Sequence, residues 1–380
     1  MNRRKWTGVV IATGAVTALL AAMACSSSSS TPAVSVGGGA GGQCATSPGT
    51  YPIANCVPYP PDAQACQSPT LACPTSPCTS SSPCLAMGAD NSSASTASLR
   101  IRKLNVTAPP ALATAFVQKA VIDQGINLHN ECGEAGDGTF NWLIQFDPTT
   151  HKVTTGGAAP TTDPFGTGYC FVNTSIEGLA VQPVTVDTTA NADGSFTSAV
   201  LPKLYVPIFI AATQMNAMGK SVIVLPLTNA KVENVLLSEN NNCIGNYNAD
   251  AINQVAGSTC YDDPTQCVRW TTGGSLGGYI TLAEADLVFV PQLSESLCVL
   301  LTGGAQVDTS NPNEKTCKKD SSGKILSKGD FCSTSQKAGD CQDSFWLAAT
   351  FAASAAKIVA PYADSCKGVP IGGSSDAGGQ

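Results

Sequence analysis

Apolar and polar residues alternate along much of the middle of the chain. In FNWLIQF, Phe140, Trp142, Ile144 and Phe146 occupy every second position, which places them on one face of an extended strand. Further apolar segments follow, separated by residues that favour turns. These segments span residues 169–173, 179–186, 195–211, 221–227 and 231–238. Several short strands at this spacing predict a mainly β fold, an antiparallel sandwich or jelly roll.

Short helices are expected near the C-terminal end of this domain. Thr281, with Glu284 three residues later, forms a capping-box pattern, so a helix is expected to begin there. Ser294 is expected to cap a second short helix through ESLCVLL, which a glycine pair then ends.

The longest predicted helix spans residues 343–360. The segment is rich in alanine, begins at Asp343, has Lys357 near its end and is followed by Pro361. A membrane-spanning helix is the alternative for so apolar a segment. A length of about 17 residues, together with Lys357, favours a buried core helix.

The first 25 residues have the layout of an export signal. Three basic residues at positions 3–5 precede an uncharged, largely apolar segment that ends at Cys25. Ala22-Met23-Ala24-Cys25 resembles the lipobox of bacterial lipoproteins, although that family usually has Leu where this chain has Ala22. The resemblance implies cleavage before Cys25 and a diacylglycerol on its thiol. An uncleaved transmembrane helix is the alternative.

The cysteine count agrees with lipidation of Cys25. The chain has 17 cysteines, an odd number that leaves one unpaired in an oxidising compartment. Without Cys25 an even set remains, and a disulfide framework of this density indicates the periplasm or the cell surface. Zinc is disfavoured because no Cys-x-x-Cys pair occurs, and His129 with Cys132 is interpreted as a loop histidine beside a bridge cysteine. The disulfide candidates are Cys44, Cys56, Cys66, Cys73, Cys78, Cys84, Cys132, Cys170, Cys243, Cys260, Cys267, Cys298, Cys317, Cys332, Cys341 and Cys366.

Composition divides the chain into six predicted segments. The signal peptide is followed by a flexible Ser/Gly tether, a Cys/Pro-rich module or stalk, a linker, the β domain with its C-terminal helices, and a disordered tail. In that order the segments cover residues 1–24, 25–43, 44–87, 88–98, 99–370 and 371–380.

Charge excludes some partners. Only 12% of residues are charged, and the formal net charge of −7 becomes −10 when the three basic residues of the signal are removed. An acidic chain without a Lys/Arg cluster is not expected to bind nucleic acid or anionic lipid headgroups. Membrane attachment is therefore expected through the lipid anchor alone.

One segment resembles a catalytic motif. GGSLGG, residues 273–278, contains G-x-S-x-G and resembles the nucleophile elbow of α/β-hydrolases, with Ser275 as the nucleophile. That fold places its histidine after the serine, whereas His129 and His151 both precede Ser275. The glycines are therefore interpreted as a tight loop before the helix at Thr281, and no catalytic residue is assigned.

Acidic clusters are the other candidates for chemistry. They lie in NECGEAGDG, CYDDPTQC and GDFCSTSQKAGDCQD, where they could provide calcium ligands or glycosidase acids. Asp262 and Asp263 are the calcium candidates. The alternative is that these aspartates start turns and cap helices, as expected for Asp343. No cofactor other than this possible Ca²⁺ is expected, because no phosphate loop or dinucleotide fingerprint is present.

These observations favour a lipid-anchored protein of the bacterial cell envelope with a non-catalytic binding or structural role. Ser26 after Cys25 fits the outer-membrane sorting that the lipoprotein resemblance implies, either facing the periplasm or at the cell surface. A glycan, a wall polymer or another envelope protein is the expected partner, because loops held on a rigid β scaffold suit recognition. The alternative is a secreted-type, glycan-directed hydrolase with an active site that the sequence does not identify.

Overall fold

A computed structural model describes eight parts of the chain, all within the second of its two units, Gln43–Gln380. The described residues are 89–114, 117–126, 138–161, 164, 167–209, 222–247, 270–291 and 293–359. Strands dominate them, and every pairing between the strands is antiparallel. The predicted mainly β, antiparallel fold is therefore confirmed.

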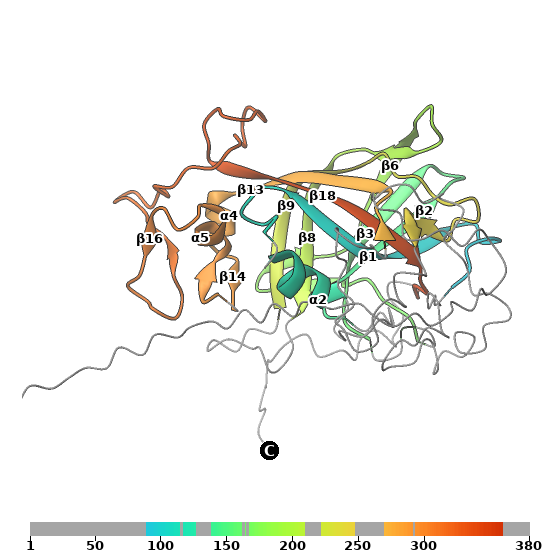
Figure 1. The fold of residues 1–380 in the computed structure, drawn as a ribbon, viewed down its shortest axis with the longest axis horizontal. Coiled ribbons are helices and arrows are strands. Elements are labelled where there is room, and N and C mark those ends of the chain that lie inside the picture. Colours follow the sequence, from blue (N-terminus) through green and yellow to red (C-terminus); the bar gives the residue numbers. More distant parts are fainter. Residues whose placement is uncertain are drawn as a thin grey trace, which may run out of the picture. The chain divides into compact units, whose positions relative to one another are not determined.

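Ten strands form the main sheet (Figure 1). Nine of them pair in the order β7-β6-β3-β2-β1-β18-β13-β9-β8, and β10 also pairs with β18. Their bounds are β1 (Ala97–Ala108), β2 (Asn141–Asp147), β3 (Lys152–Ala158), β6 (Val184–Ala190), β7 (Phe196–Ser198), β8 (Leu201–Phe209), β9 (Val222–Glu233), β10 (Cys243–Ile244), β13 (Gly274–Thr281) and β18 (Ser344–Ala355).

Four two-stranded ribbons and four short helical segments complete the described structure. The ribbons pair β4 (Thr174–Ile176) with β5 (Leu179–Val181), β11 (Asn246–Tyr247) with β12 (Trp270–Thr271), β14 (Phe289–Val290) with β15 (Glu295–Ser296), and β16 (Val307–Asp308) with β17 (Thr316–Cys317). The helical segments are the π-helix η2 (Val117–Asp123), α2 (Gln124–Ile126), α4 (Leu282–Ala285) and α5 (Leu297–Leu301). No helix among the described residues is long and apolar enough to cross a membrane.

The main sheet curls so that β7, at one end, meets the segment that follows β9. Phe196 of β7 exchanges two backbone hydrogen bonds, both 2.9 Å, with Val235, which follows β9. Phe196 also stacks on Phe146 of β2, with the ring centroids 4.3 Å apart. One curled sheet thus encloses the core. The predicted sandwich or jelly roll is not confirmed.

Alternation along the strands determines which residues form the core. The predicted strand at FNWLIQF is β2, and its Trp142 and Ile144 are buried, as is Phe140 just before it. The predicted segment at 221–227 and the beginning of the segment at 231–238 belong to a single strand, β9, which ends at Glu233. The predicted segment at 195–211 divides into β7 and β8.

The predicted helix over residues 343–360 is wrong. Its residues form β18, a central strand between β1 and β13. Alanine favours helix in isolation, but tertiary context overrides that preference in a sheet. Ala352, Ala353 and Ala355 are completely buried. Their small side chains let other parts of the fold pack closely against both faces of the strand.

The two short helices are confirmed, with one change of cap. At α4 the capping box is present: the Glu284 N–H donates to Thr281 Oγ1 at 3.2 Å, and Glu284 Oε2 accepts from the Thr281 N–H at 3.4 Å. At α5 the cap is Ser296 and not the predicted Ser294. Ser296 is buried, and its Oγ accepts from the N–H of Val299 at 3.3 Å.

All six cysteines in the described residues form disulfides. Cys298 bonds to Cys317 and Cys332 bonds to Cys341. Cys170 and Cys243 are also disulfide-bonded. Cys25 and the remaining candidates lie outside the described residues.

The β domain includes residues that the sequence assigned to a linker. β1 begins at Ala97, within the predicted linker of residues 88–98. Asn91 is also buried, and its N–H donates to Asn242 Oδ1 at 2.6 Å. Residues before Leu99 therefore also pack in the β domain.

Candidate functional site

The G-x-S-x-G segment forms a strand and not the predicted loop. Residues 274–281 are β13, which pairs with β9 on one side and β18 on the other. The Ser275 hydroxyl donates to the backbone carbonyl of Glu233 at 3.2 Å. His151 is an exposed turn residue between β2 and β3. Within the described residues, the Ser275 hydroxyl therefore has a structural role.

Several predicted site residues lie outside the described part of the chain. They are the lipidation candidate Cys25, the calcium candidates Asp262 and Asp263, and His129 with Cys132. Their roles stay predictions. The third acidic cluster is described, and its Asp330 lines a groove of the sheet.

Two clusters in the described residues have donor sets that could in principle hold a metal. Each consists of one aspartate and two cysteines, Asp286 with Cys298 and Cys317 in the first. The cysteines of each cluster are bonded to each other, so their sulfur atoms are not available as thiolate ligands. The side chains of both clusters therefore have a structural role.

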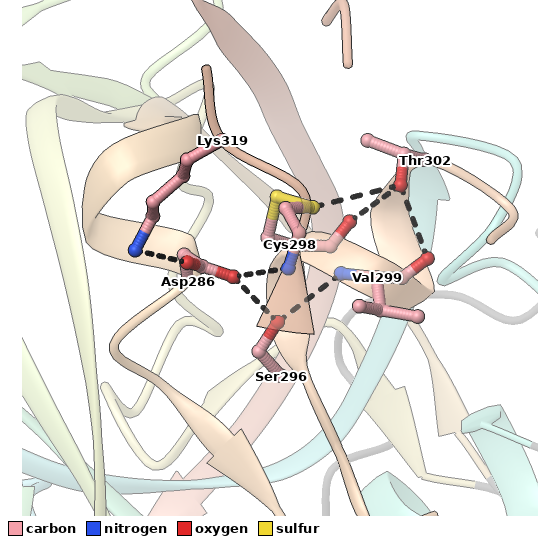
Figure 2. Close-up of a disulfide and its surroundings, with 7 residues drawn as sticks. Asp286, Ser296, Cys298, Val299, Thr302 and Lys319 are labelled. Carbon is pink, nitrogen blue, oxygen red and sulfur yellow. Dashed lines mark hydrogen bonds and ion pairs between the residues drawn. A yellow bond between two sulfur atoms is a disulfide. The ribbon is translucent and has the colours of Figure 1, made fainter. Parts of the chain in front are cut away.

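Asp286 shows what such a cluster does (Figure 2). Its Oδ1 accepts from the N–H of Cys317 at 2.7 Å and from the hydroxyl of Ser296 at 3.0 Å. Its Oδ2 forms an ion pair with Lys319 Nζ at 2.9 Å. The buried carboxylate and the Cys298–Cys317 disulfide together fasten α5 to the following ribbon.

The best candidate site is a groove of about 580 Å³ on the outer face of the sheet, within the size range of small-molecule sites. We call it the outer groove. Three sheet strands form its floor, and the loop before β18 provides a wall. Its residues are Val200, Asn229, Lys231, Glu233, Gly277, Tyr279, Asp330, Phe331, Gln336, Ala338 and Trp346.

An aromatic cluster forms the centre of the outer groove. The Phe331 ring lies between those of Tyr279 and Trp346, with centroids 5.3 Å from each and interplanar angles of 35° and 43°. Tyr279 and Phe331 are buried, whereas Trp346 is half-buried and keeps part of its indole at the groove surface. Tilted pairs at this distance are favourable, so the cluster provides a rigid apolar platform.

Gly277 makes room for the indole of Trp346. A Cβ atom at Gly277 would lie 2.6 Å from Cζ2 of Trp346, closer than side-chain atoms pack. Tyr279 pairs with Trp346 across β13 and β18, and the indole covers the glycine diagonally. A glycine in a strand often marks such a close approach.

The disulfide Cys332–Cys341 closes the loop that provides the groove wall. Phe331, next to Cys332, exchanges backbone hydrogen bonds with Ser344 at 3.0 and 3.1 Å. The neighbouring Asp330 accepts from the backbone N–H of Trp346 at 2.9 Å. Both aromatic residues therefore have their backbones fixed.

Asp343 holds the same loop and is not the predicted helix cap. Its Oδ1 accepts from the N–H of Ser333 at 2.8 Å, and its Oδ2 accepts from the Ser333 hydroxyl at 2.6 Å. Burial alone would raise the pKa of Asp343, but these bonds and one from the Ser344 hydroxyl outweigh burial and lower it. Asp343 is thus held as an anion.

The polar side of the outer groove comes largely from β9. A β-bulge places Asn229 and Ala230 opposite the single residue Gly278, and Asn229 has a positive φ of 47°. Bulges often redirect side chains beside functional sites. Lys231 and Glu233 neutralise each other in an ion pair of 2.9 Å.

Tyr279 is a hydrogen-bond donor in this site. Burial, with smaller contributions from the negative charges of Glu284 and Asp343, raises the pKa of Tyr279. Its hydroxyl therefore stays protonated at neutral pH, and it donates a long bond of 3.4 Å to the carbonyl of Ser333.

The outer groove has the composition of a binding site. Its aromatic floor lies beside the amides of Asn229 and Gln336 and beside charged groups that already have partners, Lys231 with Glu233 and Asp330 with the Trp346 backbone. Sequence reasoning missed Tyr279, Phe331 and Trp346, and it assigned Trp346 to a helix. The close pair of glycines at 277 and 278 was the one signal of close packing, and it was interpreted as a loop. No family model, curated protein or solved structure matches this chain.

Proposed function

We propose that this is a lipid-anchored envelope protein whose β domain binds a neutral glycan in the outer groove, without catalysis. The observation that carries the proposal is the rigid aromatic cluster with the half-buried Trp346 at the groove surface. A sugar ring has an apolar C–H face and a polar edge. An aromatic platform beside amide groups is complementary to both.

The charges in the outer groove favour a neutral ligand. Lys231 and Glu233 compensate each other, and Asp330 uses one oxygen to hold Trp346. The other polar groups of the lining are neutral: the amides of Asn229 and Gln336, the Tyr279 hydroxyl and the Trp346 indole N–H. Amides hydrogen-bond hydroxyl and acetamido groups in either direction, so they suit a neutral sugar better than a uronate.

Anchoring through Cys25 belongs to the same proposal. The lipobox-like segment and the Ser/Gly tether support it, and the tether would span roughly 25 Å as a random coil. All six described cysteines are in disulfides, which fits an oxidising compartment. We propose the outer membrane as the location, with the domain facing the periplasm or the cell surface.

The test is binding of neutral cell-wall and capsular oligosaccharides by calorimetry, using the full chain with Cys25→Ser. Trp346→Ala should weaken binding about 30-fold, about 2 kcal/mol, because a central aromatic anchor is lost. Tyr205→Ala is the matched control, since this half-buried aromatic of β8 does not line the groove. Unchanged affinity in Trp346→Ala would refute the site. Cleavage of the sugars would instead support the hydrolase alternative.

A further inference from the structure

A second cavity lies on the inner face of the curled sheet. Its volume is about 150 Å³, and its walls come from three parts of the fold. β1, β2, β8, β9, β13 and β18 provide one wall, η2 provides the second, and the segment from Val288 to Leu300 provides the third. Figure 1 shows α5 and β14, from the third part, at one end of the sheet. We call this space the inner cavity.

The lining of the inner cavity is apolar throughout. Its residues are aliphatic or glycine, apart from the aromatic rings of Phe140 and Trp142. The Trp142 indole N–H is already used, because it donates to Thr155 Oγ1 at 2.7 Å. Water needs two to four polar partners to be stable in a cavity. The lining offers water none, whereas an apolar cavity of similar volume is known to bind benzene.

The cavity communicates with the surface at an apolar rim. Several of its large side chains are only partly buried although they pack against the main core. They are Leu112, Ile122, Ile208, Ile223, Leu225, Leu293 and Leu300. Apolar side chains gathered at an opening are typical of a ligand-binding groove.

Polar and covalent links fix the elements that form two of the walls. On the η2 side, Lys103 Nζ forms a buried ion pair with Asp123 at 3.0 Å. Gln118 Nε2 donates to the carbonyl of Leu104 at 2.6 Å and to Asp123 Oδ1 at 2.9 Å. On the α5 side, the Cys298–Cys317 disulfide fastens α5 to β17. The cavity can therefore persist in a fold that otherwise packs tightly.

We propose that the inner cavity binds the aliphatic chain of a lipid, inserted between η2, α5 and the sheet. The dry lining and the apolar rim both match a hydrocarbon chain. The proposal does not depend on the outer groove or on lipidation of Cys25. It predicts a second binding activity in the same domain.

Trp142 provides a direct test because it lines the cavity. The full chain with Cys25→Ser is titrated with doxyl-labelled stearic acid below its micelle concentration, and tryptophan fluorescence is recorded. Saturable quenching is expected, and Trp142→Phe should remove most of the quenched signal. Absence of quenching in folded protein would overturn the proposal.

Blocking variants distinguish the cavity from surface adsorption. Ala349→Phe adds a ring inside the cavity and should weaken probe binding at least tenfold. Ala305→Phe makes the same change at an exposed position and should bind as the parent does. Equal binding in both variants would overturn the proposal. If Ala349→Phe does not fold, Val106→Phe at the half-buried rim is the second blocking variant.

Discussion

The two faces of β9, β13 and β18 differ sharply although they belong to the same strands. Toward the inner cavity, Leu276 and Gly278 alternate with residues that face the outer groove, Gly277 and Tyr279. The inner face is entirely apolar. The outer face combines three aromatic rings with amides and a compensated ion pair.

This comparison shows how one period-two pattern can serve two ligand chemistries. Successive side chains of a strand point to opposite faces, so each face can change composition without moving the other. A disulfide lies beside each surface: Cys298–Cys317 at the inner cavity and Cys332–Cys341 at the outer groove. The two surfaces should therefore be separable by mutation.

Removing the disulfides one at a time should have the largest effect on the two surfaces. Replacing both cysteines of either pair by alanine should cost about 3 kcal/mol, because the unfolded chain gains the entropy of an open loop. Loss of Cys298–Cys317 should abolish binding of the lipid probe but spare glycan binding. Loss of Cys332–Cys341 should do the reverse. Chemical denaturation and the two binding assays measure both effects.

If either double variant lost both activities while still folded, the two surfaces would be coupled through the sheet. Each cysteine pair is the matched control for the other.

Alanine substitutions at the adjacent residues Gly277 and Gly278 test the difference between the two faces of β13. Gly277→Ala should displace the Trp346 indole, since the new Cβ would lie 2.6 Å from it. Overpacking of this kind costs about 2 kcal/mol, and glycan affinity should fall about tenfold. Gly278→Ala places its Cβ 3.1 Å from Cα of Ala230, on the other face.

Gly278→Ala should therefore disturb the contact between β13 and β9 while the Trp346 platform stays in place. Calorimetry with the oligosaccharide compares the two variants directly. Equal loss of glycan affinity in both would mean that strand distortion, and not the position of the indole, determines binding.

The sequence predicted those features that depend on local chemistry. The alternation around Trp142 gave β2, and the Thr281–Glu284 box gave α4. It failed at β18, where alanine propensity indicated helix but burial between β1 and β13 required a strand. It also could not find the outer groove, because Phe331 and Trp346 meet Tyr279 only after a disulfide loop folds back on the sheet. Cysteine pairing follows the same rule, since it depends on the fold and not on spacing.

The smallest expected effect concerns pH and the wall of the outer groove. The pKa of Asp343 is lowered in the folded chain, so its hydrogen bonds add stability above the unfolded pKa of about 3.9. That contribution is lost as the pH falls from about 4 through the lower folded pKa. It should amount to about 1 kcal/mol, given that the group is partly exposed. The free energy of unfolding, measured by denaturation between pH 2 and pH 7, should therefore fall less on acidification in Asp343→Asn than in the parent. The control is Glu239→Gln, at an exposed position, which should follow the parent. Asp343 holds only the wall of the outer groove, so Asp343→Asn should leave binding of the lipid probe in the inner cavity unchanged. A parallel loss of probe binding would contradict the independence of the two faces.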